Sequence, residues 1–95
     1  MRLIARTDAN QVEIVKALRD MGANVMILAQ LGGGIPDLLC GYLGKTYLWE
    51  CKVKGGGLTD DEAEFFANWR GGHAHVIHSA EEAVDIMLED DEEEN

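Results

Sequence analysis

Clusters of glycine divide this chain into short segments. Three glycines and a proline follow one another within residues 31–36, and further glycine runs occupy residues 55–57 and 71–72. Glycine leaves the backbone unrestricted and proline lacks an amide donor, so both interrupt helices and strands. The chain therefore folds as a series of short helices and strands joined by glycine-rich loops.

The 95 residues are enough for one domain, and their charge is unevenly distributed. Nine of the 18 acidic residues lie in residues 81–95, so residues 1–80 carry nine acidic against eight basic side chains. Residues 89–94 are all Glu or Asp, and a block of like charges repels itself. We therefore predict a folded domain over residues 1–88 and a disordered acidic tail over residues 89–95. The near-neutral domain leaves a nucleic-acid function open.

The compartment follows from what the sequence lacks. No apolar run reaches the ~20 residues that span a bilayer, and the N-terminus does not resemble a secretory signal. We therefore expect no membrane association and a cytoplasmic location. Cys40 and Cys51 lie in apolar, strand-like runs without a metal-ligand spacing, and we interpret them as buried free thiols.

The pattern of apolar residues predicts an α/β fold of αβββαβα order, with a mixed central sheet flanked by helices. The predicted helices span residues 9–21, 59 to the glycines at 71–72, and 79–88, and the predicted strands span residues 24–29, 37–43, 46–54 and 73–78. Each helix begins with a capping pair, which is Asp8 with Gln11, Thr59 with Glu62, and Ser79 with Glu82. Gly44-Lys45 is the expected two-residue turn. The last crossover predicts that strand four runs parallel to strand three.

The third predicted strand carries the candidate chemistry. Glu50 and Lys52 are two residues apart and project from one face, while apolar neighbours take the other. Asp37 begins the paired strand, directly after the glycine-rich loop. Two carboxylates beside a lysine are costly to bury without a cation, and they suit phosphodiester hydrolysis with a hard divalent ion. On these residues alone, a surface ion pair on a half-exposed strand is the alternative interpretation.

These residues resemble a known nuclease pattern. Gly34–Leu38, a hairpin and then Trp49–Lys52 resemble the G-x-P-D … (D/E)-x-K pattern of PD-(D/E)xK nucleases. From about Asp8 to Val84 the chain is similar to the virus-type replication-repair nuclease (VRR-NUC) branch, especially its short stand-alone phage members. The resemblance implies a restriction-endonuclease-like core.

The resemblance also implies a function and a site. It implies a Mg²⁺ cofactor, with Mn²⁺ as a substitute, and a homodimer that cuts branched DNA such as four-way junctions. The implied catalytic residues are Asp37, Glu50 and Lys52, and the implied metal ligands include the backbone carbonyl of Cys51 beside the two carboxylates. We therefore expect a structure-selective endodeoxyribonuclease, with Holliday-junction resolution as the leading activity. A nickase or flap-type nuclease of phage replication and repair, and a catalytically silent domain that binds DNA or protein, are the alternatives.

The chain departs from this pattern at two positions. Related nucleases often place a Glu on the first helix as a further metal ligand, and the matching inward residue here is Gln11. We count Gln11 among the candidate catalytic and metal-binding residues and rank Glu13 below it, because Glu13 faces outward on the predicted helix. Many relatives carry a Gln early in the second helix, where Glu62 stands here, and helix capping alone explains Glu62.

The remaining polar and aromatic candidates are given structural interpretations. His73, His75 and His78 have no cysteine pair to complete a zinc site, so we interpret them as surface or helix-capping residues. Phe65 and Trp69 are suited to stacking on nucleobases, but their helical spacing favours a place in the core.

Overall fold

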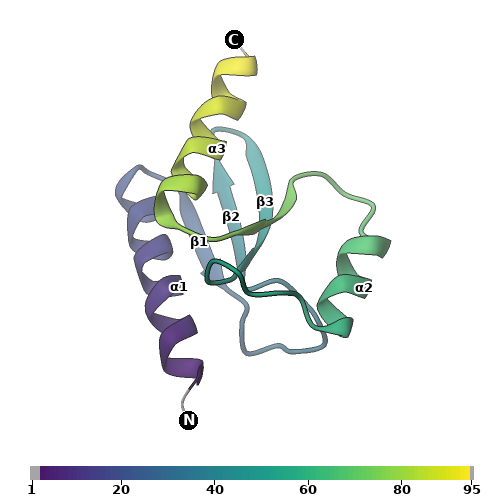
Figure 1. Ribbon diagram of the computed structural model, residues 1–95. Coiled ribbons are helices and arrows are strands. Elements are labelled where there is room, and N and C mark those ends of the chain that lie inside the picture. Colours follow the sequence, from purple (N-terminus) through teal and green to yellow (C-terminus); the bar gives the residue numbers. More distant parts are fainter. Residues whose placement is uncertain (1–2, 95) are drawn as a thin grey trace.

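The computed structural model describes the backbone of residues 3–94 and the side chains of residues 10–92. It is an α/β fold in which helices flank a mixed four-stranded sheet (Figure 1), as the sequence predicted. The elements in chain order are α1 (Leu3–Asp20), β1 (Asn24–Ile27), β2 (Leu38–Tyr42), β3 (Lys45–Cys51), α2 (Asp60–Asn68), β4 (Ala74–Ile77) and α3 (Ala80–Glu94). None of these helices is long and apolar enough to cross a membrane, within the part of the chain that the structure describes.

The sheet has the strand order β1-β2-β3-β4. The first three strands are antiparallel to their neighbours, and β4 runs parallel to β3, which confirms the predicted pairing. The hairpin turn lies one residue earlier than predicted, at Leu43-Gly44, because Tyr42 pairs with Lys45. Both turn residues have positive φ, 48° and 86°, as a tight turn between twisted strands requires, and glycine at the second position makes this possible.

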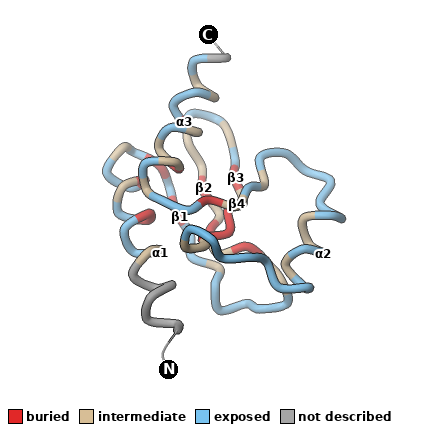
Figure 2. The backbone as a smooth tube through the Cα atoms, in the orientation of Figure 1, coloured by how far each residue is buried: buried red, intermediate tan, exposed pale blue. Residues whose placement is uncertain are grey.

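The core lies between one face of the sheet and the α1–α3 pair, which lie side by side (Figure 1). Tyr47, Trp49 and Cys51 of β3 are 0% exposed, so the predicted apolar face of this strand is confirmed. Figure 2 shows the buried stretches concentrated in the centre of the sheet and on the inner side of the helices. The other residues that complete the core are Ile14, Val15, Leu18, Ala23, Val25, Leu38, Cys40, Ile77, Ala83 and Met87.

Two helix ends differ from the prediction. α1 begins at Leu3, so Asp8 lies within the helix rather than before it, and the side chain of Asp8 lies outside the described residues. α3 continues to Glu94 through the acidic block, where the sequence predicted a disordered tail after residue 88. Asp90 accepts a hydrogen bond of 3.0 Å from the hydroxyl of Tyr47, and this contact ties the acidic block to the sheet.

The second helix is capped as predicted but packed differently. Thr59 Oγ1 accepts from the Glu62 amide at 3.2 Å, and Glu62 Oε1 accepts from the Thr59 amide at 2.9 Å, which confirms the capping box. None of the residues of α2 is buried, because this helix stands on the side of the sheet away from α1 and α3. The prediction that Phe65 and Trp69 belong to the core is therefore wrong: Phe65 is half-buried and Trp69 is exposed.

Candidate active site

Asp37 is held at the junction between the glycine-rich loop and β2. Its backbone carbonyl accepts from the Leu28 amide at 2.6 Å, and buried Pro36 precedes it. Its side-chain Oδ2 accepts from the Cys51 amide at 3.0 Å. Because β2 begins only at Leu38, the Cys51 amide donates to the carboxylate of Asp37 and not to the backbone of a further β2 residue. The loop thus delivers one carboxylate to the C-terminal end of β3.

Glu50 is a buried acid on the second face of β3. Only 3% of the residue is exposed, and it is the only charged residue classed as buried among the described side chains. Its Oε1 atom accepts no hydrogen bond from the described residues, although the protonated side chain shares a hydrogen bond with Glu62. A buried carboxylate oxygen without a partner is costly, because no water or donor compensates its lost hydration. An electropositive group beside this oxygen would offset that cost when the acid is ionised.

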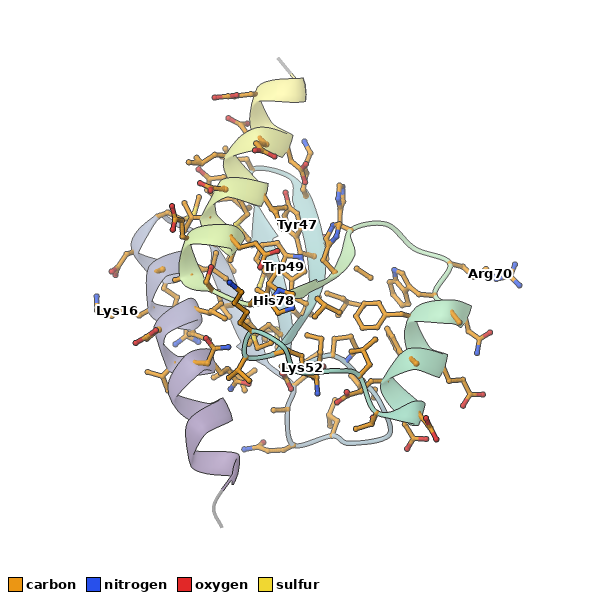
Figure 3. All side chains as sticks on the ribbon, in the orientation of Figure 1. Lys16, Tyr47, Trp49, Lys52, Arg70 and His78 are labelled. Atoms are coloured by element: carbon orange, nitrogen blue, oxygen red, sulfur yellow. The ribbon has the colours of Figure 1, made fainter. Side chains whose placement is uncertain are left out.

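Lys52 shares the face of Glu50 and connects β3 to α2. Its Nζ lies 3.5 Å from Glu50 Oε2 and 2.9 Å from Glu62 Oε1. Figure 3 shows Lys52 between the sheet and the second helix. Since the same Oε1 of Glu62 also accepts from the Thr59 amide, one atom caps α2 and orients the lysine.

The pKa values in this cluster follow from burial and charge. Burial, the negative charges of Asp37 and Glu62, and a hydrogen bond with the Glu62 side chain raise the pKa of Glu50 to about 8, although Lys52 opposes the shift. Burial also disfavours the ionised Glu62, but its hydrogen bonds from Lys52 and Thr59 outweigh burial and lower the pKa of this side chain. Glu50 therefore holds a proton at neutral pH unless further positive charge arrives.

The donor set fits a hard divalent cation. Mg²⁺ binds through one or two carboxylates and retains several waters, and Asp37 and Glu50 supply that number of carboxylates. The amide and carbonyl of a strand residue point to the same side, so the carbonyl of Cys51 faces the Asp37 side of β3 as its amide does. This geometry suits the predicted role of the Cys51 carbonyl. No group of three or more His, Cys, Asp or Glu side chains is preassembled for a metal among the described residues.

In α1, Asn10 contacts the backbone of Lys52, whereas Gln11 lines a separate pocket. Asn10 Nδ2 donates to the backbone carbonyl of Lys52 at 3.4 Å. Gln11 is half-buried and lines a pocket of about 390 Å³ that also includes Val12 and Ile27. Glu13 is exposed, as its predicted outward position requires. A role for Gln11 at the metal stays a prediction.

Sequence reasoning missed two contacts of this cluster. Asn10 lies four residues before Ile14 and eight before Leu18, both 0% exposed, so this spacing was the available signal for an inward side chain. From the sequence, helix capping alone accounts for Glu62. Its pairing with Lys52 depends on where α2 lies relative to the sheet, which local patterns do not encode.

The cysteines and histidines take no part in the cluster as side-chain ligands. Cys40 and Cys51 are buried free thiols, as predicted, and burial raises the pKa of Cys40 to about 12. The three histidines are exposed, also as predicted.

A comparison with protein-family models, curated proteins and solved structures gives no match to this chain. The chemistry of the cluster itself is therefore the basis for assigning a function.

Proposed function

We propose that this protein is a metal-dependent endodeoxyribonuclease of the PD-(D/E)xK type, with a restriction-endonuclease-like core, that acts on branched DNA. The observation that carries the proposal is the buried Glu50 carboxyl with its raised pKa, with the charge of Asp37 acting on it and the Lys52 ammonium 3.5 Å away. A buried acid with a raised pKa in a cluster of charges is typical of a functional site.

Each residue has a distinct part in this proposal. Asp37, Glu50 and the Cys51 carbonyl would hold Mg²⁺ or Mn²⁺, which when bound supplies Lewis-acid polarisation of the phosphate and a more acidic water. Lys52 donates hydrogen bonds towards the attacking water or to phosphate oxygens as negative charge develops on them. Glu62 keeps the ammonium group of Lys52 directed at this face, through the 2.9 Å contact.

Point variants separate a nuclease from a silent binding domain. Lys52→Ala should retain Mn²⁺ binding in calorimetry and lose turnover by about 100-fold or more, because the lysine contributes to the transition state. Asp37→Ala should lose both metal binding and turnover. The matched control is Lys16→Ala, since Lys16 is an exposed lysine of α1 that pairs with Asp20. The assignment would be overturned if Lys52→Ala cut DNA at the wild-type rate, or if the wild-type protein cut no DNA at all.

We also propose that the working enzyme is a homodimer. A four-way junction has two symmetric strands to cut, and one chain supplies one cluster, so a two-fold dimer matches the substrate. β1 is an edge strand of the described sheet, and Met26 and Ile27 on it are exposed, as is Val12 on α1. Exposed edges and apolar side chains favour association. Light scattering at micromolar protein, alone and with junction DNA, should give twice the mass of one chain. A monomer under both conditions that still cuts paired strands symmetrically contradicts the dimer.

A further inference from the structure

The aromatic residues at the end of α2 form an exposed platform. Trp69 is 40% exposed, and its ring stacks on that of Phe65 with centroids 5.4 Å apart and planes 19° apart. The indole is also held in place, because its Nε1 donates to the Gly72 carbonyl at 3.3 Å. The ring lies against Gly71, where an added β-carbon would meet it at 2.6 Å. An exposed but fixed indole is ready to bind a planar group without losing conformational freedom.

Trp69 forms one side of a groove of about 520 Å³ on the second face of the sheet. We call it the Trp69 groove, and the residues that matter for its chemistry are Leu39, Lys45, Thr46, Leu48, Trp69 and His73. Leucines supply apolar surface, whereas the His73 ring at one side of the groove lies 3.5 Å from the Asp90 carboxylate of α3. None of the residues that line this groove is acidic, although the chain carries a net charge of −10. The groove is thus suited to a ligand with apolar, planar faces.

The groove is continuous with the candidate active site. Leu48 and Glu50 of β3, and Lys52 one residue beyond its end, alternate and therefore lie on one face, with about 7 Å between successive members of the row. Leu48 lines the groove, and Glu50 and Lys52 belong to the catalytic cluster. A DNA strand that runs along this row from Lys52 would place its neighbouring nucleotides beside Leu48 and the Trp69 groove.

We propose that the Trp69 groove binds unpaired nucleobases of the DNA strand that enters the active site. Bases in a duplex are stacked on each other and cannot pack against a protein ring, whereas unpaired bases readily stack on exposed aromatic side chains. The inference rests on the proposed nuclease function and deepens it, because it makes a single-stranded segment next to the scissile phosphate the recognised feature. The apolar walls and the Trp69 ring contact the bases.

Intrinsic fluorescence tests this proposal directly. The chain has two tryptophans, and Trp49 is 0% exposed, so a DNA-dependent change reports on Trp69. The wild-type protein is titrated at low salt with a short thymidine oligonucleotide and with an abasic oligonucleotide of equal length. Both titrations are run with Ca²⁺ in place of Mg²⁺ and again in EDTA. We expect the thymidine strand to quench the emission and to bind roughly 5- to 100-fold more tightly than the abasic strand.

Two variants and a control complete the test. Trp69→Leu should bind both strands with the weak affinity of the abasic strand, as measured by anisotropy of labelled DNA. Trp69→Phe retains an aromatic ring and should keep most of the preference, which separates stacking from a loss of folding. Leu88→Ala removes an exposed apolar side chain of α3 and should bind as the wild type does.

The outcomes distinguish this inference from the proposed function. Equal affinity of the wild type for both strands, or unchanged binding by Trp69→Leu, overturns the base-binding role even if the protein cuts DNA. A Trp69 signal that changes with protein concentration and not with DNA also overturns it, and shows that a second copy of the chain covers the groove. Stacking without cleavage of any substrate, in contrast, refutes the nuclease and retains the groove as a site for single strands.

Discussion

Replacing Glu50 by Gln should stabilise the protein in the absence of divalent cations. The side chain is buried and its pKa is raised from 4.5 to about 8. A raised pKa means that the folded state holds the proton more tightly than the unfolded state does. The proton's contribution to the free energy of unfolding is fully present below pH 4.5, and it is lost as the pH rises towards 8.

The size of the effect follows from the shift. Each pH unit between the two pKa values corresponds to about 1.4 kcal/mol. At pH 9 the ionised Glu50 therefore costs up to about 5 kcal/mol relative to a neutral group, and water that enters beside the carboxylate reduces this figure. Glutamine has the same shape without the charge. We expect the free energy of unfolding of Glu50→Gln to exceed that of the wild type by a few kcal/mol at pH 9 and by almost nothing at pH 4.

Urea denaturation in EDTA, repeated from pH 4 to pH 9, measures this difference. The matched control is Glu64→Gln, since Glu64 is an exposed acid of α2 and its replacement removes no buried charge. Adding Mg²⁺ at pH 8 should then stabilise the wild type and leave Glu50→Gln unchanged. A stability difference that is independent of pH would refute the account of Glu50 as a buried acid with a raised pKa.

Three further substitutions test the elements that position the site. Gly34→Ala should lower both the melting temperature and the rate of cleavage, because φ at Gly34 is +83° and a β-carbon there would meet the backbone carbonyl of Asp61. A variant that melts and cuts as the wild type does would contradict this close approach. Thr59→Ala should cost about 1 kcal/mol in urea denaturation through loss of the helix cap, and an unchanged midpoint would argue against it. Tyr47→Phe should cost about 1 kcal/mol and speed amide exchange near Asp90, whereas equal exchange would mean that the hydrogen bond does not hold the end of α3.

Local patterns predicted the parts of this fold that depend on neighbours in sequence. The alternation along β3 correctly placed Trp49 and Glu50 on opposite faces, although the strand ends at Cys51 and not at Lys54. The short crossover correctly gave a parallel β4. Thr59 and Glu62 formed the expected capping box because all its atoms lie within one helical turn.

Long-range contacts account for what the sequence did not predict. The acidic end of α3 is helical where self-repulsion predicted disorder, and the contact from Asp90 to Tyr47 spans 43 residues. The helical spacing of Phe65 and Trp69 predicted burial, but it does not encode whether a sheet lies beneath that face of the helix. The identity of the α1 side chain nearest the site depends on the rotation of one helix about its axis, which brings Asn10 to the Lys52 carbonyl.

The most direct test of the nuclease is cleavage of four DNA forms side by side. Duplex, flap, fork and four-way-junction substrates of matched sequence are incubated with the wild type and with Glu50→Gln, each with Mg²⁺ and with EDTA. The account predicts that the wild type cuts the branched substrates in preference to the duplex, only with the metal, and that Glu50→Gln cuts none of them. Absence of cleavage of every substrate by the wild type, or equal cleavage by Glu50→Gln, would contradict it.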